Sequence, residues 1–186
     1  NGHLLELPVL HQTADEVLSR LSKDKDRLQN NPQGIFDLIK DEVLPHFDFE
    51  RMSRWVLGKY WRQASEAQQQ KFMDEFRPLL IRTYATSLLE YTDQKINYLP
   101  LRDDPSSGEV TVRSEVAQPG AFPIPIQYTV YKNDQGQWKV YDLSIDGVSL
   151  VANYRASFAK TIRSKGLDGL LQDLAERNQQ GVNAQK

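Results

Sequence analysis

The spacing of hydrophobic residues changes twice along this chain. From residue 13 to about residue 91, apolar residues recur every three or four positions, which is typical of amphipathic helices. From about residue 94 to residue 146 they alternate with polar residues or form short runs, which predicts strands. Helical spacing returns at Ser149. Because helices and strands are segregated in the sequence, the pattern predicts an α+β fold with helices wrapped on a curved, mostly antiparallel sheet of four strands.

The first block contains several recognisable helix boundaries. Asp48 is placed to cap a short helix that ends near Gly58. Ser65 and Gln68 form a capping box at the start of a long helix. Pro78 lies inside that helix, where its ring and its missing N–H predict a kink or a break.

The predicted strands cover residues 95–101, 110–116, 124–130 and 137–145. Pro123 and Pro125 lack N–H donors, which places the start of the third strand at an edge or a rim of the sheet. The fourth strand carries bulky apolar residues on both faces, which indicates apolar neighbours on both sides. Asp146-Gly147 then turns the chain into a helix that we expect to end at Gly166, followed by a short helix over residues 168–177.

The composition is that of one ordinary globular domain of 186 residues. We assign the domain to residues 13–178, with residues 1–12 poorly ordered or derived from a vector, and residues 179–186 a frayed tail. A formal net charge of −2 predicts no nucleic-acid partner. The absence of cysteine excludes disulfides and thiolate metal ligands, and no apolar run is long enough to span a membrane.

Candidates for catalysis are few, and we predict no catalytic residue, metal or cofactor. The three histidines lie far apart in the sequence: His3, His11 and His46. Ser149 follows Gly147-Val148, but Val151 stands where a nucleophile elbow needs glycine, so Ser149 is read as a helix N-cap. Asp142 lies among apolar residues of the fourth strand. It is either a general base with a raised pKa or, as we favour, a bulge residue bonded to backbone amides.

Apolar residues from the long helix, the third strand and the fourth strand converge on the segment from Gln137 to Phe158. Such stripes are more often packed core than a ligand site, and periodicity cannot separate a filled core from a lined cavity.

Two stretches of sequence resemble a known family. The first contains LPHFD at 44–48, VLGKYWRQAS at 56–65 and, after Gln68, FMDEFRPLLIRTY at 72–84. The second contains GQWKVYDLSIDGVSLVANYR at 136–155, then Phe158, then KGLDGLL at 165–171. Together they resemble the periplasmic phospholipid-binding proteins of the maintenance-of-lipid-asymmetry pathway, also called the toluene-tolerance auxiliary family. The resemblance covers residues 28–177.

The resemblance implies an NTF2-like fold around a deep apolar cavity that takes phospholipid acyl chains. It implies a monomeric periplasmic shuttle whose partners are an inner-membrane ABC transporter with a ring of MCE domains and an outer-membrane lipoprotein–porin complex. It also implies a signal peptide that this chain lacks. The expected lipid-contact residues come from both helices and strands. They are Val56, Tyr60, Phe76, Leu80, Tyr84, Leu88, Ile124, Ile126, Tyr128, Val140, Leu143, Ile145, Val148, Val151, Tyr154 and Phe158.

Two alternatives to a lipid shuttle stay open. One is an NTF2-like enzyme that acts on a hydrophobic small molecule and uses Asp142 as its base. The other is a structural partner module without a cavity. Phospholipid in an organic extract of the purified protein would distinguish the shuttle from both.

Overall fold

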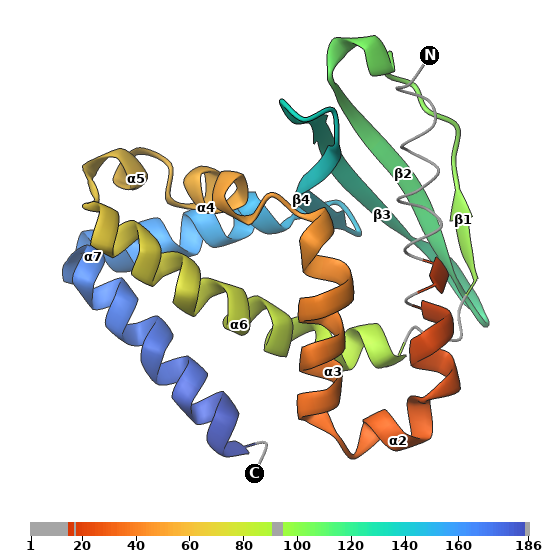
Figure 1. The fold of residues 1–186 in the computed structure, drawn as a ribbon, viewed down its shortest axis with the longest axis horizontal. Coiled ribbons are helices and arrows are strands. Elements are labelled where there is room, and N and C mark those ends of the chain that lie inside the picture. The colour runs from red at the N-terminus through yellow and green to blue at the C-terminus, as the bar shows by residue number, and fades with distance from the viewer. Residues whose placement is uncertain (1–14, 17, 91–94, 185–186) are drawn as a thin grey trace.

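The computed structural model describes residues 15–16, 18–90 and 95–184, and the side chains of residues 86–90 and 182–184 lie outside the description (Figure 1). Helices occupy one side of the molecule and a sheet the other, and α7 starts directly after the last strand, β5 (Figure 1). Besides the helical residues 15–16 and 18–23, the α-helices are α2 (Lys25–Gln29), α3 (Pro32–Leu38), α4 (Phe49–Leu57), α5 (Lys59–Gln63), α6 (Glu66–Glu90) and α7 (Leu150–Ala184). A π-helical turn η1 (Ile39–Val43) and a 3₁₀ turn η2 (Leu44–His46) lie between α3 and α4, and a second 3₁₀ turn η3 (Pro105–Ser107) lies between the first two strands.

The sheet confirms the predicted α+β class but has one more strand than we predicted among the described residues. Its order follows the sequence, and all neighbours are antiparallel: β1 (Ile96–Tyr98), β2 (Glu109–Gln118), β3 (Ala121–Lys132), β4 (Trp138–Ile145) and β5 (Val148–Ser149). The extra strand arises at Asp146-Gly147, where both residues have positive φ, 51° and 85°. This combination is typical of a type I′ hairpin turn, which folds the chain back along β4 for two residues before α7 begins.

Of the kink or break predicted at Pro78, the break is wrong, and the kink stays a prediction. Pro78 lies inside α6, and the helix runs without interruption from Glu66 to Glu90. Phe76 and Leu79, on either side of the proline, are buried in a cluster of apolar side chains that includes Val151 and Phe158 of α7. This burial offsets the one backbone hydrogen bond that the proline cannot donate.

The predicted helix end at Gly166 is confirmed, although the following segment is longer than expected. Gly166 has φ 77° and ψ 172°, so two helical segments of α7 meet there at an angle. The second segment continues to Ala184 instead of ending at Arg177.

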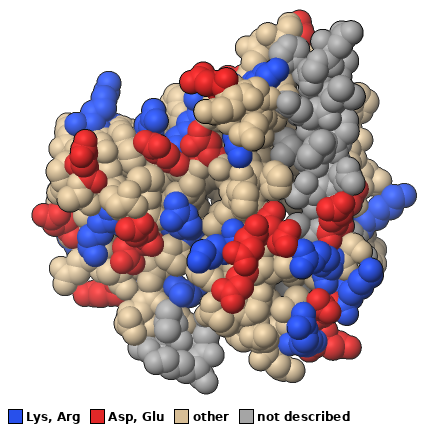
Figure 2. Space-filling model, viewed as in Figure 1, with Lys and Arg blue, Asp and Glu red and all other residues tan. Residues whose placement is uncertain are grey.

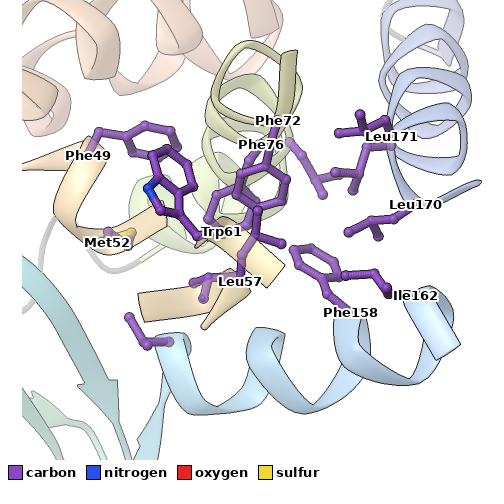
Figure 3. Packing of buried hydrophobic residues seen from close by; sticks show 14 residues of the cluster. Phe49, Met52, Leu57, Trp61, Phe72, Phe76, Phe158, Ile162, Leu170 and Leu171 are labelled. Atoms are coloured by element: carbon purple, nitrogen blue, oxygen red, sulfur yellow. The ribbon is translucent and has the colours of Figure 1, made fainter. Parts of the chain in front are cut away.

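Two hydrophobic clusters determine how the helices and the sheet are joined. The first, called the helical core here, lies between α4, α5, α6 and α7, and its side chains point toward one another (Figure 3). The second, called the sheet core, consists of Val110, Val112, Val130, Trp138 and Val140. Phe47 packs against both clusters. The next residue, Asp48, donates its backbone N–H to the carbonyl of Val140 at 2.8 Å, so the start of α4 is attached to β4.

The predicted caps of α4 and α6 are confirmed. The Asp48 carboxylate accepts a hydrogen bond from the Arg51 N–H at 2.9 Å. Ser65 and Gln68 exchange two hydrogen bonds, with the Ser65 hydroxyl accepting from the Gln68 N–H at 3.1 Å and the Gln68 amide oxygen accepting from the Ser65 N–H at 2.9 Å. These local bonds satisfy N–H groups that a helix leaves unpaired at its start.

Candidate functional site

The sheet face that carries the sheet core, called the inner face here, aligns most of the predicted strand residues. One row joins Val112, Tyr128 and Leu143 across β2, β3 and β4. The next row joins Ser114, Ile126, Ile145 and Val148. Val116 and Ile124 follow as a third pair. Since directly opposed residues of neighbouring strands share a face, the register brings Ile124, Ile126, Tyr128, Leu143, Ile145 and Val148 together.

A β-bulge explains why β4 does not alternate cleanly. Thr129 is opposite Asp142 while Val130 is opposite Val140, so Tyr141 is the extra residue. One extra residue shifts the alternation, and Val140 and Leu143 therefore both point to the inner face. The apolar residues that seemed to serve two faces of β4 belong largely to one.

Burial divides the inner face into two parts. Val110, Val130 and Val140 in the sheet core are 0–7% exposed. On β3 and β4 five further residues of this face are apolar but only half-buried, namely Ile124, Ile126, Tyr128, Leu143 and Ile145, whereas Ser114 and Val116 on β2 are 1% and 5% exposed. Val148 is 55% exposed. A contiguous apolar sheet surface that the protein leaves partly uncovered is typical of a binding face for an apolar partner.

Several predicted contact residues lie in the helical core instead. Val56, Phe76, Val151 and Phe158 are 1–6% exposed and are packed among other side chains. The ring centroids of Phe76 and Phe158 lie 5.6 Å apart in an edge-to-face arrangement. As lipid contacts these four residues stay a prediction, while their packing accounts for them as structural core.

Half-buried residues form the border of that core. Tyr60, Leu80 and Tyr154 pack against it without being buried in it. The Tyr84 hydroxyl on α6 hydrogen-bonds to Tyr154 on α7, and burial together with this bond raises the pKa of Tyr84. This bond pairs the hydroxyls of Tyr84 and Tyr154 in half-buried surroundings. Leu88 lies in α6, but its side chain is outside the described residues.

The hydroxyls of Ser114 and Tyr128 on the inner face are paired within the sheet. The Ser114 hydroxyl donates to the carbonyl of Ile126 at 2.8 Å. The Tyr128 hydroxyl hydrogen-bonds to Ser114, and burial raises the pKa of Tyr128. Burial also raises the pKa of Tyr98 on β1, which lies directly opposite Ser114 of β2 in the strand register. Both tyrosines are neutral at physiological pH, so the face that they contribute to carries no charge from them.

Asp142 has a structural environment. Its Oδ1 accepts the N–H groups of Leu143 at 2.8 Å and Val151 at 3.1 Å, and its Oδ2 accepts the Ser149 hydroxyl at 2.6 Å. Ser149 in turn accepts the Ala152 N–H at 3.1 Å, which confirms it as the N-cap of α7. The carboxylate therefore holds the bulge of β4 to the start of α7, as the favoured sequence interpretation predicted.

A hollow of about 270 Å³ lies between the two segments of α7. Its walls include Phe158 and Leu170, but also Asp173, Glu176 and Arg177. Three ionisable groups in so small a space make an unfavourable environment for an acyl chain.

The described part of the chain contains no group of three or more His, Cys, Asp or Glu residues arranged to hold a metal ion. Among the helices described, none combines the length and the apolar character needed to cross a bilayer. Positive and negative side chains are interspersed on the surface in view, without a large area of one sign (Figure 2).

Sequence reasoning missed several inner-face residues. Val112 and Val116 alternate clearly with polar residues, so their shared face was visible, but they were not assigned to the site. Ser114 interrupts the same alternation with a hydroxyl that only the folded sheet pairs with Ile126. Tyr98 lies in a strand of three residues, which is too short to establish a period.

Comparisons with known proteins agree on one family. The family described as MlaC protein matches residues 11–176. The chain is 26% identical over 176 residues to the intermembrane phospholipid transport system binding protein MlaC of Haemophilus influenzae, covering 94% of this chain and 82% of that protein. It is 28% identical over 183 residues to the toluene tolerance protein ttg2D of Pseudomonas putida, covering 95% and 84%.

A solved structure matches the fold as well as the sequence. The phospholipid-binding protein of Ralstonia solanacearum, determined in complex with a phospholipid, superimposes with a TM-score of 0.87 at 37% identity. The match covers 95% of this chain and 98% of that one. The family resemblance predicted from residues 28–177 is therefore confirmed: this chain belongs to the MlaC family.

Proposed function

We propose that this protein binds a phospholipid by its acyl chains on the half-buried part of the inner face and carries it across the periplasm. The observation that carries the proposal is the row of Ile126, Ile145 and Val148, which is apolar and incompletely covered by the protein. The related Ralstonia protein, which was solved with a phospholipid, supports the same ligand class.

The free energy of burying acyl chains determines how much apolar contact this face must provide. Burial of a methylene stabilises by about 0.8 kcal/mol, so two chains of about sixteen carbons contribute on the order of 25 kcal/mol in a bilayer. A carrier has to offer comparable apolar contact, or the lipid stays in the membrane. Transfer between two apolar environments is then nearly balanced, and its direction comes from the partner complexes.

The proposal assigns no catalytic role to the chain. The three hydrogen bonds that Asp142 accepts leave it as a link between β4 and α7, not as a free base. The names of the related proteins describe binding and transport.

Adjacent residues of β3 provide a matched test of lipid binding. Ile126→Glu introduces a charge on the inner face, whereas Gln127→Glu introduces the same charge one residue along, on the opposite face. We expect native mass spectrometry to detect bound phospholipid in the wild type and in Gln127→Glu, and none in Ile126→Glu. A folded wild type without lipid, or equal loading of the two variants, would contradict the proposal.

We further propose that the protein exchanges lipid with an inner-membrane ABC transporter that carries an MCE-domain ring, and with an outer-membrane lipoprotein–porin complex. Lipid-loaded protein should transfer labelled phospholipid faster to vesicles that contain either membrane complex than to vesicles that contain neither complex. Equal transfer rates to all vesicles would contradict the proposal that these complexes are partners. Release of the protein by osmotic shock of cells expressing the whole gene tests the periplasmic location, and retention with the cytoplasm would refute it.

A further inference from the structure

The uncovered part of the inner face, called the strip here, runs along two strands. On β3 it contains Ile124, Ile126 and Tyr128, and on β4 it contains Leu143 and Ile145, all half-buried. The inner-face residues of β2 are buried instead. The strip is therefore only two strands wide, about 5 Å between strand axes, but about 13 Å long between its outermost residues on β3. An acyl chain that occupies the strip has to lie along the strands.

Exposure falls from one end of the strip to the other. Val148, at the open end, is 55% exposed. Beyond Tyr128 and Leu143, the next inner-face residues are Val130 and Val140 of the sheet core, which are 0% and 7% exposed. A phospholipid on the strip would keep its polar headgroup in water at the open end, because burying the headgroup is unfavourable. The ends of its acyl chains would then point toward the sheet core.

Phe47 lies beside the buried end of the strip. Its side chain packs against the sheet core and also against the helical core. Its backbone forms a parallel bridge with Val140, the first buried residue past the strip on β4. Because protein interiors are close-packed, a phenyl group at the junction of two cores leaves an acyl chain no path between them.

The backbone next to Phe47 is attached to two strands. The Asp48 N–H donates to the carbonyl of Val140 on β4 at 2.8 Å. The Asp48 carboxylate accepts a hydrogen bond from the Tyr131 hydroxyl on β3. The Arg51 guanidinium covers the ring of that tyrosine, 3.9 Å from the ring centroid. These contacts hold Phe47 in place, so its phenyl group is suited to act as a fixed barrier.

We propose that Phe47 and Val140 form a stop that limits the length of the acyl chains that this protein binds. The inference rests on the proposed function and adds chain-length selectivity to it. From Ile124 to Val130, where the sheet core begins on β3, the distance along the strand is about 20 Å, of which about 13 Å is half-buried. One leaflet of a bilayer has a hydrocarbon thickness of about 15 Å. The strip therefore matches chains of ordinary membrane length.

A stop has a measurable consequence for longer chains. In a bilayer each added methylene is buried, but beyond the stop it finds no apolar contact on the protein. Loading from vesicles should therefore fall about fourfold for each methylene that stays uncovered. Without a stop, long and short chains would load equally well, because transfer between two apolar environments is nearly balanced.

Competition among phosphatidylcholines that differ only in chain length tests the stop. The vesicles contain equal amounts of lipids whose two monounsaturated chains have sixteen, eighteen, twenty or twenty-two carbons. Native mass spectrometry after incubation gives the ratio of the bound species, which does not depend on total loading. We expect the wild type to favour the shortest lipid over the longest by about tenfold or more, and Phe47→Ala to reduce this preference by about tenfold.

Phe49→Ala is the matched control, since it removes the same phenyl group two residues away. Phe49 belongs to the helical core, where its ring centroid lies 5.6 Å from that of Phe76. This variant should keep the chain-length ratio of the wild type. Phe47→Leu is a smaller truncation, which serves if Phe47→Ala does not fold. It should shift the ratio in the same direction by less, and circular dichroism checks the fold of all three variants.

The outcomes separate the stop from the proposed function. If the wild type binds phospholipid but loads all chain lengths equally, the stop is overturned and lipid binding stands. The same holds if the folded Phe47 variants keep the ratio of the wild type. An equal shift in Phe49→Ala would indicate a general loosening of the core and would also overturn the stop. If the wild type binds no phospholipid, both proposals fall.

Discussion

Val148→Glu tests whether lipid covers the inner face, because the residue is accessible without the ligand. Val148 is 55% exposed and lies opposite Ile145 in the two-residue strand β5. A glutamate there can stay hydrated in the lipid-free protein, so the free energy of unfolding should change by no more than about 0.5 kcal/mol. In the lipid-bound protein the same carboxyl would lie against acyl chains.

The expected penalty follows from the carboxyl pKa. An ordinary glutamate has a pKa of about 4.3, so protonating it at pH 7 costs about 3.7 kcal/mol, which weakens lipid binding on the order of 500-fold. Below pH 4.3 the side chain is already neutral, and the penalty disappears. At pH 5 the same arithmetic leaves a loss of only about sixfold. Binding by the variant should therefore recover as the pH falls.

Val148→Gln is the matched control, since it has a similar shape and polarity but no titratable group. Its lipid binding should be reduced modestly and equally at pH 7 and pH 5. The assay is competition between the protein and vesicles for a fluorescent phospholipid at the two pH values. Full binding by Val148→Glu at pH 7, or a loss without pH dependence, would show that lipid does not cover Val148.

Three other substitutions test the structural basis of the site by urea denaturation. Asp142→Ala should destabilise the protein by about 1–3 kcal/mol, because the N–H groups of Leu143 and Val151 lose their acceptor; unchanged stability would mean that the carboxylate does not hold β4 to α7. Phe158→Ala should cost about 3–5 kcal/mol, because the residue is 2% exposed and packs against Phe72 and Phe76; a cost below about 1 kcal/mol would contradict its place in the helical core. Gly166→Ala should cost about 1–3 kcal/mol through its backbone conformation alone (φ 77°, ψ 172°), since an added Cβ meets no atom within 4 Å. A neutral result would mean that the angle between the segments of α7 does not require this backbone conformation.

Local signals in the sequence predicted local structure well. The Ser65–Gln68 box, the Asp48 cap and the Gly166 helix end each depend on residues within a few positions of one another. The helix does not break at Pro78, because the local effect of the proline is opposed by burial of Phe76 and Leu79 against a helix far away in the sequence. Propensity describes one turn of a helix, whereas packing acts on the whole helix.

The candidate site was predicted in part. Alternation along β3 identified Ile124, Ile126 and Tyr128 as one face, and the register confirms that they share it. The same kind of apolar pattern in the helices selected Phe76 and Phe158, which the structure packs into a core. Hydrophobic periodicity reports which side of an element avoids water, and a neighbouring side chain or a ligand can cover that side equally well.

The segment around β4 separates the two kinds of information. By itself the sequence determined the α+β class, the turn at Asp146-Gly147 and the capping role of Ser149, because each depends on short-range sterics and hydrogen bonds. Only the tertiary structure decided that a bulge at Tyr141 turns Val140 and Leu143 to one face. It also decided that the Asp142 carboxylate accepts a hydrogen bond from the start of α7. It also decided which apolar residues are buried and which stay uncovered, since burial depends on elements that meet only when the chain folds.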